Sequence, residues 1–304
     1  MPLIECVPNV SEGRRADVIA AIARAIAVPG VQLLDRSSDP SHNRTVYTFA
    51  GEPAAVREAA QGLFAAAIAS IDLRAHEGVH PRIGAVDVVP FVPLLDASMD
   101  QCVALAKEVA KAVSDRFGLP VFLYEEAAAT DDRRNLADVR RGGLNGLAHR
   151  MKSPEWRPDF GPSQPHPTAG ATAIGARPIL IAYNVNLATN RLSVAKRIAA
   201  LIRTSGGGFG FVKAMGVPLE HRGIVQVSMN LTNYKDTSMT TVFDAIAREA
   251  AVDGVRVLES EIVGLVPADA LPSDPTRRLK LRPEDLDRVL EVRLEKEKGT
   301  TKNE

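Results

Sequence analysis

Apolar residues along the chain fall into two blocks that alternate short β-branched runs with longer stretches at helical spacing. Short runs predict strands, and stretches with apolar residues every three or four positions predict helices. The first block predicts strands over 3–7, 31–35, 45–50 and 85–92 and helices over 16–28, with Ser11 available as a cap, and 53–71. The turn formers of 37–43 predict an antiparallel hairpin, so the order is βαββαβ.

A further helix over 99–117 and a strand over 120–124 follow, whereas 125–158 is charged, interrupted by glycine and weakly periodic. The second block repeats the order βαββαβ. It predicts strands over 178–187, 211–219, 224–231 and 255–263 and helices over 192–203 and 240–251. The tail over 296–304 is charged and of low complexity, so we expect it to fray.

These blocks predict an α+β protein built from two ferredoxin-like βαββαβ sandwiches, although the halves share no repeat at the level of residues. We expect the two domains at 1–177 and 178–304. Each sheet would carry helices on one face only, so its other face must be covered. The simplest arrangement packs one sheet toward the other, with a ligand cleft between the halves.

The composition excludes several classes of function. Lys plus Arg and Asp plus Glu number 37 each, so no overall field favours nucleic acid or an anionic membrane. The chain has no run of about 18 apolar residues and no signal-peptide pattern at its start, so we expect no membrane span. The two cysteines, Cys6 and Cys102, lie far apart in apolar segments, which predicts reduced, buried thiols and a cytoplasmic location.

The segment over 74–84 is the most polar connector before a predicted strand, and it holds His76, Glu77, His80 and Arg82. Loops held by a sheet often carry catalytic groups, and an imidazole of ordinary pKa exchanges protons near neutral pH. The plain alternative is a solvated loop with incidental histidines.

A metal site is a further alternative, because His76 and His80 lie four residues apart. On a helix that spacing would place both rings on one face. Gly78 and Pro81 oppose such a helix, and no second cluster of ligands supports a hydrolytic metalloenzyme. We therefore expect no metal.

Three other segments could bind a ligand. Asn9 and Ser11 lie at a strand-to-helix junction, which either binds an anion or is an ordinary helix cap. Arg44 offers a planar fork to a carboxylate, or is only a turn arginine. A Pro- and Gly-rich segment is either a linker or a place of close backbone approach; its residues are Gly161, Pro162, Ser163, Gln164, Pro165, His166, Pro167, Thr168, Ala169 and Gly170.

Ordered motifs over about residues 3–270 resemble the glutamate formimidoyltransferase family. In the first half they are ECVPNVSEG at 5–13, NRTVYTF at 43–49, HPRIGAVDVVPF at 80–91 and PDFGP at 158–162. In the second half they are GAT at 170–172, GAR at 175–177, NVNL at 184–187, QVSMNL at 226–231 and VGLVP at 263–267. So many matches in the family's order are more specific than any single short motif.

The resemblance implies transfer of the formimidoyl group of N-formimidoyl-L-glutamate to tetrahydrofolate in histidine degradation and one-carbon metabolism. It implies His80 as the catalytic base and the segment from Gly161 to Gly170 as the folate contact, although Thr168 and Ala169 depart from the family's pattern before the last glycine. We assign the substrate carboxylates to Arg44 and Arg82.

The same resemblance implies a homodimer with tetrahydrofolate as co-substrate and no metal. Some family members carry an appended cyclodeaminase, for which we expect this chain to be too short. The residues leave open formyl transfer, action on 5-formyltetrahydrofolate, and a folate-binding protein without turnover.

Overall fold

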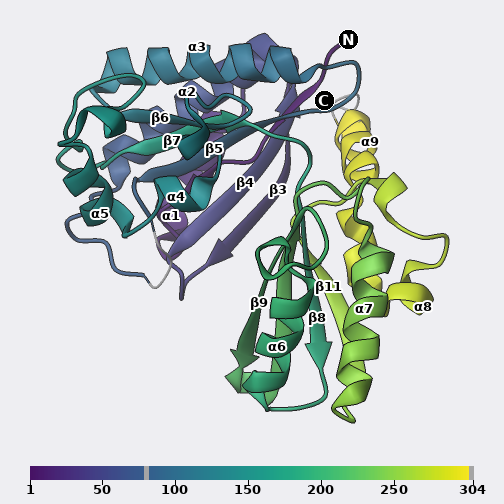
Figure 1. Cartoon of the computed structure of the whole chain (residues 1–304). Coiled ribbons are helices and arrows are strands. Elements are labelled where there is room, and N and C mark those ends of the chain that lie inside the picture. The colour runs from purple at the N-terminus through teal and green to yellow at the C-terminus, as the bar shows by residue number, and fades with distance from the viewer. Residues whose placement is uncertain (79–81, 301–304) are drawn as a thin grey trace. The chain divides into compact units, whose positions relative to one another are not determined.

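The computed structural model describes residues 1–78 and 82–300, and the chain forms two compact units, Met1–Arg177 and Pro178–Glu304. Each unit combines helices with one β-sheet, so the protein is of the mixed α+β class (Figure 1). No helix in the described part of the chain is both long and apolar enough to cross a membrane.

The first unit holds a sheet of seven strands. β1 (Ile4–Cys6) and β2 (Asn9–Val10) lie between β4 (Arg44–Gly51) and β5 (Val86–Pro93), and all of these pairs are antiparallel. β3 (Val31–Asp39) pairs with β4 at one edge. At the other edge, β7 (Thr172–Ala176) lies between β5 and β6 (Val121–Glu125) and is parallel to both.

The pattern of the sequence did not predict β7, because the next strand was expected to begin only at residue 178. Its residues are Thr-Ala-Ile-Gly-Ala, a small-residue run with a weak strand signal. Every one of them is buried, and Gly175 lies under Tyr124, where an added Cβ would be 2.5 Å from the Tyr124 carbonyl oxygen. The strand is therefore specified by its neighbours in the sheet rather than by its own pattern.

Helices cover the two faces of this sheet unequally. α1 (Ala16–Ile26), α2 (Pro53–Ser70) and α3 (Met99–Phe117) pack on one face around the main core. The other face of β5, β6 and β7 is covered by a smaller cluster. Its short helices are η1 (Asp131–Arg133), α4 (Leu136–Val139), α5 (Gly143–Arg150) and η2 (Pro154–Trp156).

Two local expectations about this unit were wrong. Ser11 does not cap α1, because the Glu12 carboxylate accepts the backbone N–H groups of Arg14 and Arg15, both at 2.9 Å, just before the helix. The hairpin turn is also shorter than expected. β3 continues to Asp39, and the hydroxyl groups of Ser38 and Thr45 lie 2.8 Å apart across the strand pair.

The second unit has four antiparallel strands in the order β11-β8-β10-β9. Along the chain they alternate with two helices: β8 (Ile181–Leu187), α6 (Leu192–Ile202), β9 (Val212–Leu219), β10 (Ile224–Leu231), α7 (Met239–Val252) and β11 (Val257–Val263). Side chains from both helices and alternate strand positions form one core. The order of elements is the one that the sequence predicted.

The C-terminal region is more regular than expected. After η3 (Thr204–Gly206) and η4 (Glu220–Arg222) earlier in this unit, the remaining short helices are η5 (Ala268–Ala270), α8 (Pro275–Leu279) and η6 (Pro283–Arg288). α9 (Leu290–Thr300) begins before the tail 296–304 that was expected to fray and extends into it, and residues 301–304 lie outside the described part of the chain. Leu290 and Leu294 are buried, and these apolar side chains anchor its first turns.

Candidate functional site

The connector between α2 and β5 carries the candidate base. His80 lies at 79–81, outside the described residues, so the site is described from the two flanks of that segment. The residues before it end at Gly78, and those after it begin at Arg82. Both flanks are tied to the sheet by hydrogen bonds.

Asn43 joins the first flank to the β3–β4 hairpin. Its amide nitrogen donates to the Glu77 carbonyl oxygen at 2.8 Å, and its amide oxygen accepts the Gly13 N–H at 2.9 Å. The His76 Nε2 atom lies 3.1 Å from the Asn43 carbonyl oxygen. Asn43 has a φ of 49°, a left-handed conformation that asparagine tolerates better than most residues. One side chain thus connects the hairpin, the start of α1 and the connector.

The second flank is held by Arg82 and Asp87. The Arg82 guanidinium donates to the carbonyl oxygens of His76 at 2.7 Å and Gly78 at 3.2 Å, so it closes the connector on itself. The buried Asp87 carboxylate accepts the Ile83 N–H at 2.8 Å. Its second oxygen forms an ion pair with Arg140, the residue that follows α4.

The guanidinium groups of Arg44, Arg82 and Arg140 all lie within electrostatic reach of Asp87. The pKa of Arg44 is lowered by its burial and by the charge of Arg140, while Asp87 and Asp39 oppose this shift. The Arg140 Nε atom is buried and has no hydrogen-bond partner in the part of the chain that the structure describes. Three arginines outnumber the two carboxylates, so this region has a surplus of positive charge suited to a carboxylate ligand.

The Pro- and Gly-rich segment divides into two parts. Residues 161–164 are exposed, and Gly161 packs against the end of α3, where an added Cβ would be 2.6 Å from the Leu119 carbonyl oxygen. The second part closes on itself, because His166 and Gly170 exchange backbone hydrogen bonds of 2.7 and 3.0 Å. Hydrogen bonds among the described residues tie this second part to the candidate site.

Backbone contacts bring that second part against the connector. The Ala85 N–H donates to the Ala169 carbonyl oxygen at 2.9 Å, and the Ala171 N–H donates to the Ile83 carbonyl oxygen at 2.8 Å. From the opposite side, the Ser11 hydroxyl donates to the Gly84 carbonyl oxygen at 2.7 Å. Of the residues expected from the sequence, Ser11, Arg44, Arg82 and the stretch 166–170 therefore gather here. Asn9 instead donates to the nearby Val7 carbonyl oxygen at 3.2 Å.

Both units match one family of known proteins. Residues 3–177 match the formiminotransferase domain, N-terminal subdomain, and residues 182–275 match the formiminotransferase domain. The chain belongs to the formiminotransferase family. The resemblance inferred from the sequence motifs is thereby confirmed.

Relatives with this domain align along most of the chain. A glutamate formimidoyltransferase of Streptococcus pyogenes serotype M1 is 47% identical over 270 residues, which cover 88% of this chain and 90% of that protein. One of Thermoplasma acidophilum is 46% identical over 299 residues, which cover 97% of this chain and 98% of that protein. The formimidoyltransferase-cyclodeaminase of Sus scrofa is 45% identical over 276 residues, which cover 88% of this chain but 51% of that protein.

Two residues of this candidate site were not singled out from the sequence. Asp87 could have been found, because a carboxylate inside the apolar run 85–92 must be buried and needs a partner. Arg140 had no comparable signal, since it lies in a weakly periodic, charged stretch 53 residues away. Among the described residues, no group of three or more His, Cys, Asp or Glu side chains could hold a metal ion.

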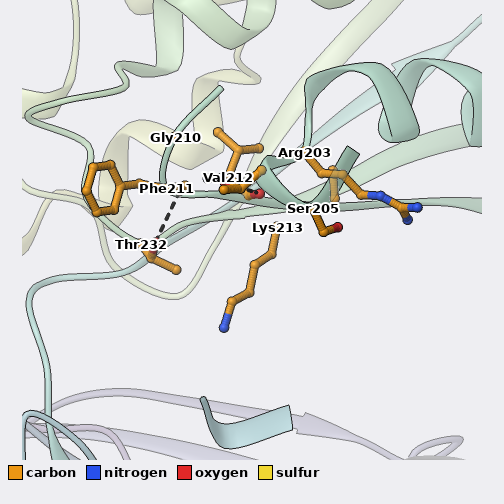
Figure 2. A pocket seen from close by; sticks show the side chains of 9 residues that line it. Arg203, Ser205, Gly210, Phe211, Val212, Lys213 and Thr232 are labelled. Carbon is orange, nitrogen blue, oxygen red and sulfur yellow. Dashed lines mark hydrogen bonds between the residues drawn. The ribbon is translucent and has the colours of Figure 1, made fainter. Parts of the chain in front are cut away.

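The second unit has a hollow of about 560 Å³ beside β9. Figure 2 shows that the charged ends of Arg203 and Lys213, which line it, extend in different directions, and that Phe211 points away from both. None of the residues expected to carry the chemistry lines this hollow. It does not form a convergent site.

The lowered pKa of His76 predicts that the stability of the protein depends on pH. Its burial, and then the charge of Arg82, lower its pKa from the ordinary value of 6.5. As the pH falls below about 6.5, the unfolded chain takes up this proton before the folded chain does, so the contribution of neutral His76 to stability is lost. We expect the free energy of unfolding, measured with urea at pH 7.5 and pH 5.5, to fall less in His76→Gln than in the wild type.

The matched control for this prediction is His221→Gln, which changes an exposed histidine of η4. It should leave the pH dependence of the unfolding free energy as in the wild type. An equal pH dependence in His76→Gln and the wild type would contradict the prediction.

Proposed function

We propose that this chain is a glutamate formimidoyltransferase, which transfers the formimidoyl group of N-formimidoyl-L-glutamate to tetrahydrofolate and releases L-glutamate. The observation that carries the proposal is the alignment of nearly the whole chain with two relatives of that name at 47% and 46% identity. The arginine-rich region around Asp87 supports it, because both substrates carry carboxylates.

His80 is the proposed acid and base. Nitrogen 5 of tetrahydrofolate attacks the amidine carbon, and the imidazole takes the proton that this nitrogen loses as the tetrahedral adduct forms. The bond from that carbon to the glutamate nitrogen then breaks. The same imidazole returns the proton to the departing nitrogen, which leaves as an amine. No metal or covalent nucleophile takes part in this sequence of steps.

We assign the carboxylates of N-formimidoylglutamate to Arg44, with Arg140 as its neighbour. Two bonds of the Arg82 guanidinium go to backbone carbonyl oxygens of the connector, so its proposed role is to hold the segment that precedes it. The proposed role of the Ser11 hydroxyl is to hold the same connector through its hydrogen bond to the Gly84 carbonyl oxygen. The Asn9 amide binds only the nearby Val7 carbonyl oxygen among the described residues.

Arg44→Gln is expected to raise the KM for N-formimidoylglutamate by about 10-fold or more with little change in kcat. A charge-assisted hydrogen bond contributes about 1.5–3 kcal/mol, and its loss weakens the ground state and the transition state alike. Steady-state kinetics at saturating tetrahydrofolate measure both constants. Arg36→Gln, which changes an exposed arginine of the same hairpin, is the control. A fall in kcat with an unchanged KM would assign Arg44 to the chemical step instead.

The folate contact is proposed for the stretch 166–170, since its backbone lies against residues 83–85. We further propose that the boundary between Arg177 and Pro178 separates two ferredoxin-like subdomains. Support comes from the antiparallel order β11-β8-β10-β9 and from the βαββαβ order of elements in both units. The proposal also places the protein in the cytoplasm as a homodimer, the commonest symmetric assembly of soluble proteins.

The purified protein mixed with tetrahydrofolate and one donor at a time tests the proposed reaction. Absorbance of the folate product is followed with N-formimidoylglutamate, N-formylglutamate or no donor. We expect turnover with the formimidoyl donor and at least tenfold less with the formyl donor, which offers oxygen in place of the amidine nitrogen. Turnover with the formyl donor alone would replace the proposed reaction by formyl transfer. If the protein binds folate but turns over neither donor, the proposed reaction is wrong and the protein is a folate-binding protein without this activity.

A further inference from the structure

In the described part of the chain, the two sheets have four edge strands, and three of them are protected against pairing with another chain. On β6, alternate N–H groups from Val121 to Glu125 donate to residues outside the sheet at 2.7 to 3.1 Å. On β11, the Ser260 N–H donates to the Lys280 carbonyl oxygen at 2.9 Å. β3 carries a bulge between Leu33 and Asp35, which disturbs the regular spacing of its backbone groups. Covered or bulged edges are poor places for a second chain to pair.

The strand β9 is the fourth edge, and its outer side can be assigned residue by residue. Among the described strands it pairs with β10 alone, at the edge of the second sheet (Figure 1). The backbone of Val212 faces away from β10, because its N–H donates to the Thr204 hydroxyl oxygen at 3.1 Å. Alternate residues of a strand turn their N–H and C=O groups to the same side. Ala214, Gly216 and Pro218 therefore face outward as well.

This outer side is closed at both ends and open between them. The Thr204 hydroxyl occupies the backbone groups of Val212 at one end. Pro218 lies at the other end and has no N–H to offer. Between them, no hydrogen bond joins the outward groups of Ala214 and Gly216 to any residue that the structure describes. A chain that pairs with β9 must do so at these two residues.

The open stretch is complementary to a second copy of itself. In an antiparallel pair about a two-fold axis at Met215, Ala214 of each copy lies opposite Gly216 of the other. Each of these two pairs exchanges two hydrogen bonds, so every outward donor and acceptor of Ala214 and Gly216 is satisfied. Val212, which is already bonded to Thr204, then lies opposite Pro218, which needs no acceptor. The donors and acceptors of the edge thus match in number and order.

The side chains of β9 suit the same register. Met215, which is 60% exposed, lies opposite Met215 of the second copy in a pair without hydrogen bonds, where side chains come closest. Lys213 lies opposite Val217, so no like charges of this strand face each other directly. Leu219 of the second copy lies opposite Phe211, which is 48% exposed and lines the hollow beside β9. The pairing therefore covers the exposed apolar side chains at this edge.

We propose that β9 pairs antiparallel with β9 of a second copy of this chain, so that the two four-stranded sheets join into one sheet of eight strands. The backbone hydrogen bonds at Ala214 and Gly216 fix the register, and the contact between the two Met215 side chains adds apolar burial. The inference goes beyond the proposed function, because it names the surface through which a dimer forms. It does not depend on the proposed reaction.

Disulfide cross-linking tests the register. The Cα atoms of a pair without hydrogen bonds lie about 4.5 Å apart, within the span of about 4.4–6.8 Å that a disulfide accepts. Met215→Cys, oxidised with copper-phenanthroline, should therefore appear mostly as a disulfide-linked dimer on a non-reducing gel. Val217→Cys is the matched control, because the two residues at 217 would be four positions apart along the strands, roughly 14 Å. Cys6 and Cys102 are buried, so the wild type should give no linked dimer.

Sedimentation equilibrium tests the surface without oxidation. The wild type should sediment with twice the mass of one chain. Met215→Lys places two ammonium groups directly opposite each other and should weaken the dimer by about 10-fold or more. Because Met215 is exposed on its own chain, the variant should fold, which circular dichroism checks. Val252→Lys changes an exposed apolar residue of α7 and should leave the dimer unchanged.

The outcomes decide the proposal separately from the transfer reaction. A monomeric wild type would mean that the open edge serves another extended chain or none, and it would overturn the proposal. So would a Met215→Lys protein that is as dimeric as the wild type, or equal cross-linking of Met215→Cys and Val217→Cys. The assay with N-formimidoylglutamate tests the reaction, and its failure would leave the result on assembly standing.

Discussion

His80→Ala lowers turnover by about 100-fold or more and leaves the affinity for tetrahydrofolate nearly unchanged. Positioned acid and base catalysis contributes about 10²- to 10⁴-fold, and the imidazole at position 80 is assigned both proton transfers of this reaction. Steady-state kinetics give kcat, and calorimetric titration gives the Kd of the folate. A loss confined to kcat indicates an interaction that matters only in the transition state.

His221→Ala is the matched control, because it removes an exposed histidine from η4 of the second unit. It should retain full turnover. Unchanged turnover in His80→Ala would mean that another group carries the proton. His76 would then be the next residue to test, since it lies in the same connector and its pKa is already lowered.

Gly84→Ala destabilises the protein by about 3 kcal/mol, the upper end of what overpacking usually costs. An added Cβ would lie 1.8 Å from the Ala171 carbonyl oxygen and 2.8 Å from that of Val86. Both atoms belong to the backbone, so no flexible side chain can move aside. Urea unfolding followed by circular dichroism measures the difference from the wild type.

Gly210→Ala serves as the control, because no heavy atom lies within 4 Å of a Cβ added there. It should change the free energy of unfolding by less than about 1 kcal/mol. The substitution at Gly84 should also reduce activity, since its carbonyl oxygen accepts the Ser11 hydroxyl beside the connector. A Gly84→Ala protein as stable as the wild type would show that the backbone at Gly84 and Ala171 can move apart.

The elements that the sequence predicted well are those with local signals. The helix Met99–Phe117 was predicted with its observed ends. In the structure, Ser98 and Gln101 form a capping box at its start, and Gly118 adopts the left-handed conformation that ends many helices. The second unit followed from alternating runs and short turns. In both cases the residues that specify the element lie within or beside it.

The features that the sequence could not supply depend on contacts between distant residues. β7 is a strand because β5 and β6 hold it on either side. The Asp87–Arg140 pair joins a buried strand to the end of a one-turn helix, and neither residue predicts the other. The cap of α1 was misassigned for a related reason, since the Glu12 carboxylate competed with the Ser11 hydroxyl for the same N–H groups and Ser11 found a partner on Gly84.

In the candidate site, too, some residues have local signals in the sequence and others depend on contacts between distant residues. Arg44, Arg82 and Ser11 could be named from the sequence because they lie in a turn, in a polar connector before a strand and at a strand-to-helix junction. The role of Arg82 could not, since its hydrogen bonds to the carbonyl oxygens of His76 and Gly78 are visible only in the structure.

The position of β7 has a consequence for synthesis of the chain on the ribosome. Val88 of β5 pairs with Ala173, so the sheet of the first unit stays open at its centre until almost all of that unit has been translated. Until then, β5 and β6 each present an unpaired edge, and such edges favour association between nascent chains. Cells that make this protein quickly would thus gain from a chaperone that shields those two strands.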